Sequence, residues 1–215
     1  MGIVQQIVEA GQEYGFFQVI NHGVSKDVAR EMSTVFKEFF NMSAENKKGS
    51  SASDGDLSRP GWIYMDSSDF AKDGINLMLN FLVTLALDEC MQSWPPRLTR
   101  YREVVATYVV EMRTLSGRIL ELICEGLGLE AGYLERLSQV QLVVGNYYPP
   151  CPDPSLTLGL LKHCDPSLIT ILLQEGNACG LQVLHNGKWI GVAPLPNALV
   201  VNIGNQLEVC LSQNF

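Results

Sequence analysis

The arrangement of apolar residues changes near Gln139, and this change limits the folds open to the chain. Before it, apolar residues recur every three or four positions over residues 3–14, 25–39 and 98–127, which is the spacing of amphipathic helices. After it, short apolar and β-branched runs are separated by Pro, Gly and Asn, which is typical of strands. The predicted strands cover residues 140–147, 155–161, 167–174, 180–184, 188–192 and 198–209. Strands that follow helices predict an α+β fold, an antiparallel jelly roll packed on the long helix.

The rest of the chain adds shorter elements to this plan. Residues 16–21 form an aromatic and β-branched run that predicts a strand, and Asn186-Gly187 is a strong signal for a two-residue hairpin turn. Residues 47–60 are rich in Gly, Ser and Asp and predict a surface loop. The most apolar run, residues 75–87, is shorter than the about 20 residues that a bilayer requires, so it predicts a buried helix.

Composition restricts the partners and the compartment. The net charge is −8 and Lys and Arg form no cluster, so we expect neither nucleic acid nor a membrane as a partner. The six cysteines include no CxxC pair, and no secretory leader precedes them. Both observations favour free thiols and a reducing, cytoplasmic location.

His163 and Asp165 are the residues that best suggest chemistry. On an extended strand, side chains two positions apart share a face, so an imidazole and a carboxylate would point the same way. Two histidines and one carboxylate on one face are the ligands of non-haem Fe(II) oxygenases. Spacing alone leaves a metal site and a surface pair that binds nothing both open. The apolar residues around the pair favour the metal site, because a buried polar group needs a partner.

A third ligand is not evident in the sequence. The two other histidines are His22, expected to be a hydrogen-bonded structural residue in the N-terminal turn, and His185, expected at the exposed tip of a hairpin. No arginine follows Arg136, although an arginine fork is the usual partner of a carboxylate cosubstrate. Tyr148, just before Pro149-Pro150, can be read as the aromatic end of a strand or as a phenol that hydrogen-bonds a ligand.

Several motifs together resemble a known family. The chain contains GFFQVINHGV near its start and, later, NYYPPCPDPSLTLG, HCD and GLQVLHNGKWIGVAPLPNALVVNIGNQLEV. These resemble the plant 2-oxoglutarate- and Fe(II)-dependent dioxygenases, and the resemblance covers most of residues 3–209. SWPPRLTRYREVV and ICEGLGL look most like the branch that contains hyoscyamine 6-dioxygenase and related enzymes of small-molecule secondary metabolism.

The resemblance implies specific roles for four residues. His163 and Asp165 would bind Fe(II), while Asn146 and Tyr148 would face the cosubstrate 2-oxoglutarate, with ascorbate in a supporting role. The implied reaction converts 2-oxoglutarate to succinate and CO2 and hydroxylates or desaturates a small plant secondary metabolite. The implied fold is an incomplete double-stranded β-helix, or jelly roll, preceded by a helical N-terminal region. The oligomeric state of the protein stays open.

We expect three parts in the chain on this basis. Residues 1–60 would form the dioxygenase N-terminal region, residues 61–138 a helical segment with the long support helix, and residues 139–215 a partial jelly-roll domain. The family's second metal-binding histidine and its RxS motif lie beyond residue 209, where this chain continues as CLSQNF. The family's usual first strand is also missing, and residues 47–87 follow the family poorly.

These departures indicate a truncated, misannotated or alternatively spliced gene product. We therefore expect weak Fe(II) binding and little turnover of 2-oxoglutarate, and whether the chain is an active enzyme stays open at this point. The first alternative to an active oxygenase is a catalytically impaired fragment that acts as a binding chain or not at all. The second is a cupin-like module that uses its metal structurally.

Overall fold

The structure is a computed structural model, and it divides into two compact units, each assembled from separate stretches of the chain. The first unit comprises Met1–Ala29, Glu111–Ser138 and Cys164–Phe215, and the second comprises Arg30–Val110 and Gln139–His163. The structure describes residues 2–43, 62–66, 77–83, 99–148, 158–176 and 179–212, together with the single positions 87, 91, 150 and 153. The expected loop at 47–60 lies outside the described residues.

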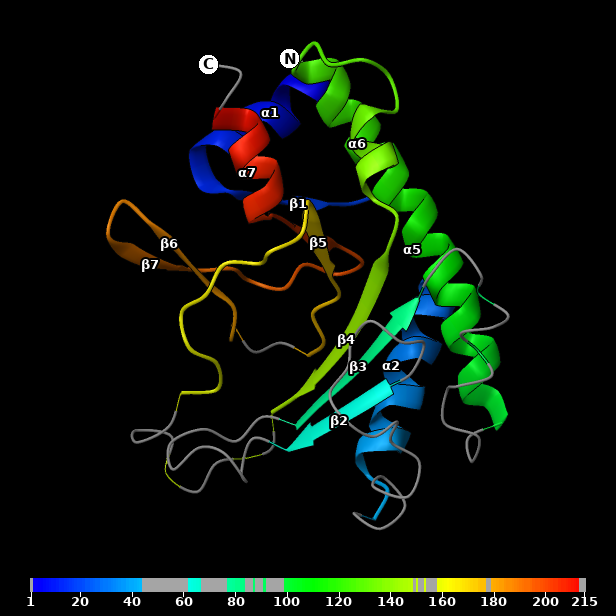
Figure 1. Cartoon of the computed structure of the whole chain (residues 1–215). Helices are drawn as coiled ribbons and strands as arrows, with labels where there is room; N and C mark the ends of the chain where they lie inside the picture. The colour runs from blue at the N-terminus through cyan, green and yellow to red at the C-terminus, as the bar shows by residue number, and fades with distance from the viewer. Residues whose placement is uncertain are drawn as a thin grey trace. The chain divides into compact units, whose positions relative to one another are not determined.

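Helices and antiparallel strands both occur, as expected for an α+β chain (Figure 1). The helices are α1 (Ile3–Tyr14), α2 (Lys26–Phe40), α5 (Thr99–Gly126), α6 (Tyr133–Leu137) and α7 (Asn205–Ser212). The strands are β1 (Phe16–Val19), β2 (Trp62–Asp66), β3 (Leu77–Val83), β4 (Gln141–Tyr147), β5 (Ile169–Leu172), β6 (Gln182–His185), β7 (Lys188–Gly191) and β8 (Leu199–Ile203). Among the described residues, no helix has the length and apolar character needed to cross a membrane.

The first unit contains a three-stranded sheet in the order β1-β8-β5 and the hairpin β6-β7. Val201, at the centre of β8, lies opposite Phe17 of β1 and Ile171 of β5, and its side chain is fully buried. The hairpin turns at Asn186 and Gly187, which have φ values of 49° and 75°. Positive φ at both positions is the signature of a type I′ turn, so the predicted hairpin is confirmed.

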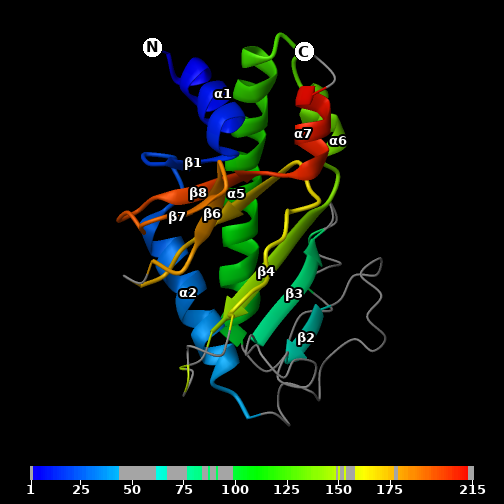
Figure 2. The same cartoon turned by 90° about the vertical axis from the view of Figure 1, so that its left-hand side faces the viewer.

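Helices cover the sheet of the first unit. Residues of α1, of the end of α5 and the position after it, of the end of β8 and of α7 line one small apolar pocket. They are Ile7, Val8, Gly11, Ile123, Leu127, Ile203 and Leu207. Helix α1 is followed by Gly15, whose φ of 74° and hydrogen bond to the Gly11 carbonyl form a C-cap. In the view of Figure 2, α1 and α7 both lie above β1 and β8.

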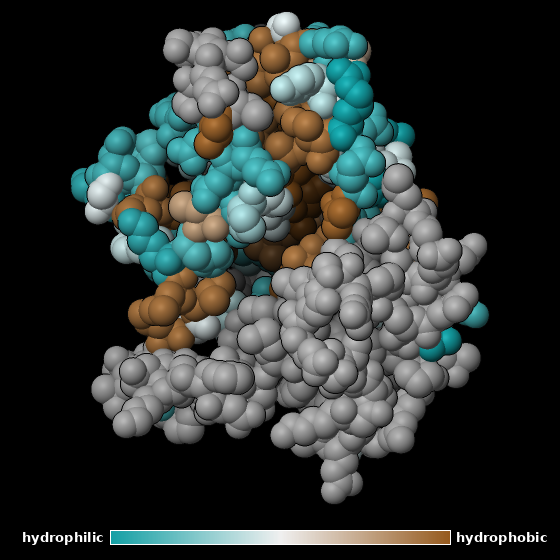
Figure 3. All heavy atoms as spheres, in the orientation of Figure 1, coloured by the Kyte–Doolittle hydropathy of each residue, from teal (hydrophilic) through white to brown (hydrophobic). Residues whose placement is uncertain are grey.

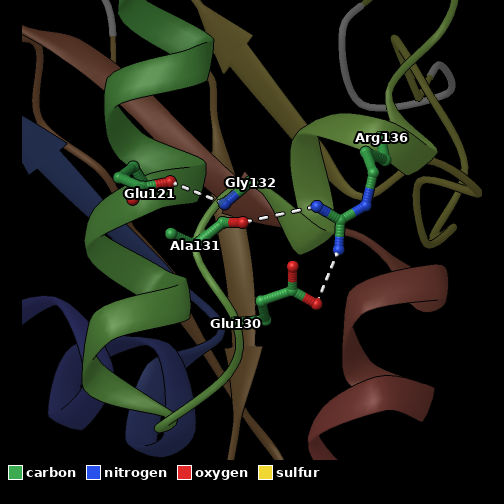
Figure 4. A network of polar contacts seen from close by, with 5 residues as sticks. All are labelled: Glu121, Glu130, Ala131, Gly132 and Arg136. Atoms are coloured by element: carbon green, nitrogen blue, oxygen red, sulfur yellow. Dashed lines mark hydrogen bonds and ion pairs between the residues drawn. The ribbon is translucent and has the colours of Figure 1, made fainter.

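The turn between α5 and α6 is held by polar contacts (Figure 4). Leu129 N donates to Cys124 O over 2.9 Å and Gly128, with φ of 65°, donates to Glu125 O, which is the Schellman arrangement that ends a helix. Glu121 Oε2 accepts a hydrogen bond from Gly132 N over 3.1 Å, and Arg136 pairs with Glu130 over 3.1 Å. These contacts fix where α6 starts.

Two glycines of α5 predict opposite effects of the same substitution. A methyl group at Gly117 would meet only Glu135 Oε1, at 3.8 Å, whereas one at Gly126 would overlap Val8 and reach Val4 of α1. We expect Gly117→Ala to raise the free energy of unfolding by about 0.5–1 kcal/mol, because alanine favours helix. Gly126→Ala should lower it by about 1–3 kcal/mol through overpacking. Urea unfolding measures both changes in the free energy of unfolding. Changes of the same sign in the two variants would contradict the packing described.

The second unit contains the sheet β2-β3-β4 and an aromatic core. Phe36 of α2 stacks on Tyr101 of α5 with 6.1 Å between ring centroids, and Phe40 stacks on Tyr147 of β4 at 5.3 Å. The ring of Phe36 lies against Gly145 of β4, where a side chain would overlap it. The helices and the sheet therefore meet through aromatic rings that only a glycine in β4 accommodates.

Burial gives the second unit a pH dependence at high pH. Desolvation raises the pKa of Tyr108 to about 12 from 10.0, and it raises the pKa of Tyr101 further still. The neutral phenol is favoured in the folded state, so its stabilisation is fully present below pH 10 and is lost as pH rises towards 12.

For Tyr108 alone the loss should be about 2–3 kcal/mol. We expect Tyr108→Phe to unfold with a shallower pH dependence than the unchanged chain in urea titrations between about pH 9 and 12. Identical slopes in the two proteins would contradict the burial of this phenol.

Three strand and helix predictions are wrong. Residues 77–83 form β3 rather than a buried helix, because they pair with β2 on one side and β4 on the other. A short apolar run does not reveal by periodicity whether it is a buried strand or a helix. Residues 198–209 are not one strand, since β8 ends at Ile203 and α7 starts at Asn205. Residues 158–161, the described part of the predicted strand 155–161, have irregular backbone.

Candidate metal centre

His163 lies in the irregular segment of residues 158–168, which precedes β5. Its Nδ1 is 2.8 Å from the main-chain oxygen of Leu161. A carbonyl oxygen only accepts hydrogen bonds, so Nδ1 is the donor in this contact, and the neutral imidazole with this tautomer has its lone pair on Nε2. Metal-binding histidines are commonly oriented by such a hydrogen bond from the other ring nitrogen. The exposed imidazole of His163 therefore fits the role of an Fe(II) ligand.

Asp165 is half-buried, and its backbone is anchored. Its main-chain oxygen accepts a hydrogen bond from Asn205 N over 2.8 Å. Neither Asp165 nor His163 lies in a strand, so the expectation that strand alternation orients the two side chains is wrong. Cys164 between them is exposed. A carboxylate beside an imidazole in sequence remains the donor chemistry that Fe(II) uses.

Asn146 and Tyr148 lie at the end of β4. Asn146 is exposed and pairs in register with Met78 of β3. The ring of Tyr148 lies on Gly159, where an added Cβ would be 3.0 Å from its Cδ1. Partial burial raises the pKa of the Tyr148 phenol, which stays a hydrogen-bond donor at neutral pH. An exposed amide and a phenol that donates are suited to binding an anionic small molecule.

The exposed face of β4 is otherwise apolar. Burial alternates along the strand, so that Leu142, Val144 and Asn146 are exposed while the residues between them are less so. Leu158, Leu160 and Leu161 are also exposed, by 65%, 48% and 72%. The space-filling view shows apolar side chains, in brown, at the surface of the described part of the chain (Figure 3). Polar Asn146 and Tyr148 thus occur among exposed apolar residues of the second unit.

The other two histidines have partners of their own. Val24 N donates to Nδ1 of His22, and His22 Nε2 is 3.2 Å from the main-chain oxygen of Asn197, so the prediction of a hydrogen-bonded structural histidine is confirmed. His185 lies directly before the turn at the tip of the hairpin, as expected, but it is not fully exposed. It is half-buried, stacks on Tyr14 with ring centroids 4.8 Å apart, and contacts Asn186 Nδ2 at 2.9 Å.

Within the part of the chain that the structure describes, His, Cys, Asp and Glu form no group of three or more arranged to hold a metal. His163 and Asp165 are thus the metal-ligand candidates that the sequence supplies. The sequence did not reveal what holds Asp165 in place, namely the chain around Gly204 and Asn205. A Gly-Asn pair after a β-branched run is a signal that a strand ends, and it falls inside the strand predicted for residues 198–209.

Two family models match separate stretches of this chain. Residues 139–214 match the 2OG-Fe(II) oxygenase superfamily. Residues 1–96 match the non-haem dioxygenase in morphine synthesis N-terminal family. The chain belongs to the 2OG-Fe(II) oxygenase superfamily. The resemblance inferred from its motifs is therefore confirmed.

Individual relatives agree with this family. The chain is 42% identical over 226 residues to hyoscyamine 6-dioxygenase of Hyoscyamus niger, a match that covers 99% of the chain and 65% of that protein. It is 42% identical over 212 residues to Protein DOWNY MILDEW RESISTANCE 6 of Arabidopsis thaliana, covering 96% of the chain and 61% of that protein. The chain therefore spans less than two thirds of the length of these relatives.

A solved structure supports the fold. The crystal structure of JOX2 in complex with 2OG, Fe and JA has a TM-score of 0.82 and 32% sequence identity with this chain. The match covers 99% of this chain and 64% of that one. Together with the antiparallel strands and the helices, it identifies the fold as α+β with a partial jelly roll.

Proposed function

We propose that this chain carries Fe(II)- and 2-oxoglutarate-binding residues of an oxygenase that hydroxylates or desaturates a small plant secondary metabolite. The observation that carries the proposal is the hydrogen bond from His163 Nδ1 to Leu161 O. It orients the imidazole of an HxD pair as a metal ligand requires, within the stretch that matches the oxygenase superfamily. The reaction would convert 2-oxoglutarate to succinate and CO2, with ascorbate in support.

Four side chains have roles in this proposal. His163 Nε2 and the Asp165 carboxylate bind Fe(II), since imidazole and carboxylate are its usual ligands in oxygenases. Tyr148 donates its phenolic proton to 2-oxoglutarate, and Asn146 donates from its amide. Bound Fe(II) and 2-oxoglutarate would supply the oxidising chemistry, with O2 as the oxidant. The chain's own residues hold these groups and place the substrate beside them.

The remaining proposals concern the substrate class, the cellular compartment and the domain organisation. The net charge of −8 supports a small-molecule substrate rather than nucleic acid or an anionic membrane surface. Cys124, Cys164 and Cys179 are free, which supports a reducing compartment, the cytoplasm. We also propose the division into residues 1–60, 61–138 and 139–215 as the organisation shared with the family.

Titration of the 215-residue chain with Fe(II) in the absence of O2, with and without 2-oxoglutarate, tests the function. We expect 2-oxoglutarate to tighten Fe(II) binding, because it would chelate the metal beside the protein ligands. The melting temperature should rise with ligand concentration. At a ligand concentration of 100 times the dissociation constant, the free energy of unfolding should increase by about 2.7 kcal/mol. Absence of any effect of 2-oxoglutarate would contradict the proposal. A rise in melting temperature with Fe(II) that 2-oxoglutarate does not change would instead favour a structural metal.

A further inference from the structure

The start of α7 contacts the backbone around Asp165 through three consecutive amides. Gly204 N donates to Leu168 O over 2.9 Å, Asn205 N to Asp165 O over 2.8 Å, and Gln206 N to Ser167 O over 3.3 Å. All of these residues belong to the first unit. Three successive hydrogen bonds fix both the position and the direction of the backbone that carries Asp165.

Gly204 makes this close approach possible. A Cβ at this position would overlap the carbonyl group of Ser167 and lie 3.1 Å from the main-chain oxygen of Asp165. The obstacle is backbone rather than the end of a flexible side chain, so it cannot yield without moving the segment. Gly204 is itself buried, and it lies where β8 passes into α7 (Figure 2). A glycine with no room for a side chain therefore holds Asp165 against the start of the helix.

We propose that Gly204 and the Asn205 amide are positioning residues for the Asp165 carboxylate, and that they set the affinity of the chain for Fe(II). This inference rests on the proposed function, because it takes Asp165 to be a metal ligand. Outer partners that orient a ligand change metal affinity by about 10–100-fold when they are lost. The backbone contacts at Asp165 act in this way, in parallel with the hydrogen bond that orients His163 within its own unit.

Two variants disturb the contact in different ways. Gly204→Ala inserts a methyl group against the Ser167 carbonyl. Asn205→Pro removes the hydrogen that Asp165 O accepts and places a ring carbon there. Asn205 is exposed and is the first residue of α7, a position at which proline is well tolerated in helices. The second variant thus targets the contact while preserving the helix.

The matched control is Gly126→Ala, which also creates an overlap in the first unit, but with Val8 of α1. It should lower stability without touching Asp165. Gly180→Ala is the neutral control, because nothing lies within 4 Å of the added carbon. All proteins are compared at a temperature at which each is folded, so that lower stability alone leaves the dissociation constant unchanged.

The dissociation constant for Fe(II), measured by calorimetry without O2, is the first readout. We expect Gly204→Ala and Asn205→Pro to raise it by about 10–100-fold, and both controls to leave it within about twofold. Amide hydrogen exchange of the metal-free chain is the second readout. The amides of residues 204 and 206, which donate to Leu168 O and Ser167 O, should exchange faster in the two variants, and at the unchanged rate in Gly126→Ala.

The outcomes separate the inference from the function. Tight Fe(II) binding by the unchanged chain with equal affinity in Gly204→Ala and Asn205→Pro overturns the inference and leaves the function intact. A loss of affinity in Gly126→Ala equal to that in Gly204→Ala also overturns it, because the effect would then be one of stability. Failure of the unchanged chain to bind Fe(II) overturns the proposed function and the inference with it.

Discussion

Replacing His163 by alanine is expected to weaken Fe(II) binding by at least about 100-fold, since the loss of even an outer-shell partner costs 10–100-fold. The imidazole is directed by its hydrogen bond to Leu161 O, and alanine removes both the metal-binding nitrogen and that bond. Asp165→Asn should act similarly, because it replaces an anionic oxygen ligand by a neutral amide of the same shape. Calorimetry without O2 and the Fe(II)-dependent rise in melting temperature measure both effects.

His185→Ala is the control for this experiment. His185 is a histidine of the same chain, but its ring stacks on Tyr14 and contacts the Asn186 side chain. We expect this variant to keep the Fe(II) affinity of the unchanged chain and to lose only a little stability. If His185→Ala removed Fe(II) binding and His163→Ala did not, the ligand assignment would be wrong.

Gly145→Ala is expected to lower the free energy of unfolding by about 1–3 kcal/mol or more, through overpacking. The added methyl group would overlap the ring of Phe36, which is fixed between Phe40 and Tyr101. The ring cannot move away without disturbing Tyr101, whose side chain is fully buried. Equilibrium unfolding in urea measures the loss.

The double variant Phe36→Ala/Gly145→Ala tests whether overlap with the Phe36 ring causes the loss of stability. Phe36→Ala alone should be destabilising, by about 3–5 kcal/mol, because it leaves a cavity in an aromatic core. In that background Gly145→Ala should cost much less, since the obstructing ring is gone, so that the two changes are not additive. Additive losses would show that Gly145 is required for another reason, such as its backbone conformation.

Local patterns predicted much of the fold. Helices α1 and α5 follow from periodicity, and the Asn186-Gly187 turn follows from residues with defined backbone preferences. Strand β3 was missed because a run of apolar residues becomes a strand only when β2 and β4 pair with it. Pairing between distant segments is tertiary information, and a short sequence window does not contain it.

The candidate site, too, could be predicted from the sequence only in part. His163, Asp165, Asn146 and Tyr148 could be selected from their chemistry and their motifs. The contacts that position them could not, because Asn205 meets the Asp165 carbonyl from 40 positions further along the chain (205 minus 165). Such contacts also use backbone atoms, which every residue has, so no residue type marks them in advance.

The pairing of β1 with β8 has a consequence for the order of folding. Phe17 and Val201 lie opposite each other, 184 positions apart (201 minus 17), so this part of the sheet depends on very distant contacts. Contacts of this kind form slowly, because closing a long loop costs entropy before the contact is made. On the ribosome, Phe17 is made 184 residues before Val201, so β1 waits for its partner while those residues are synthesised. Throughout that time its apolar edge would need a chaperone or a temporary contact to stay out of aggregates.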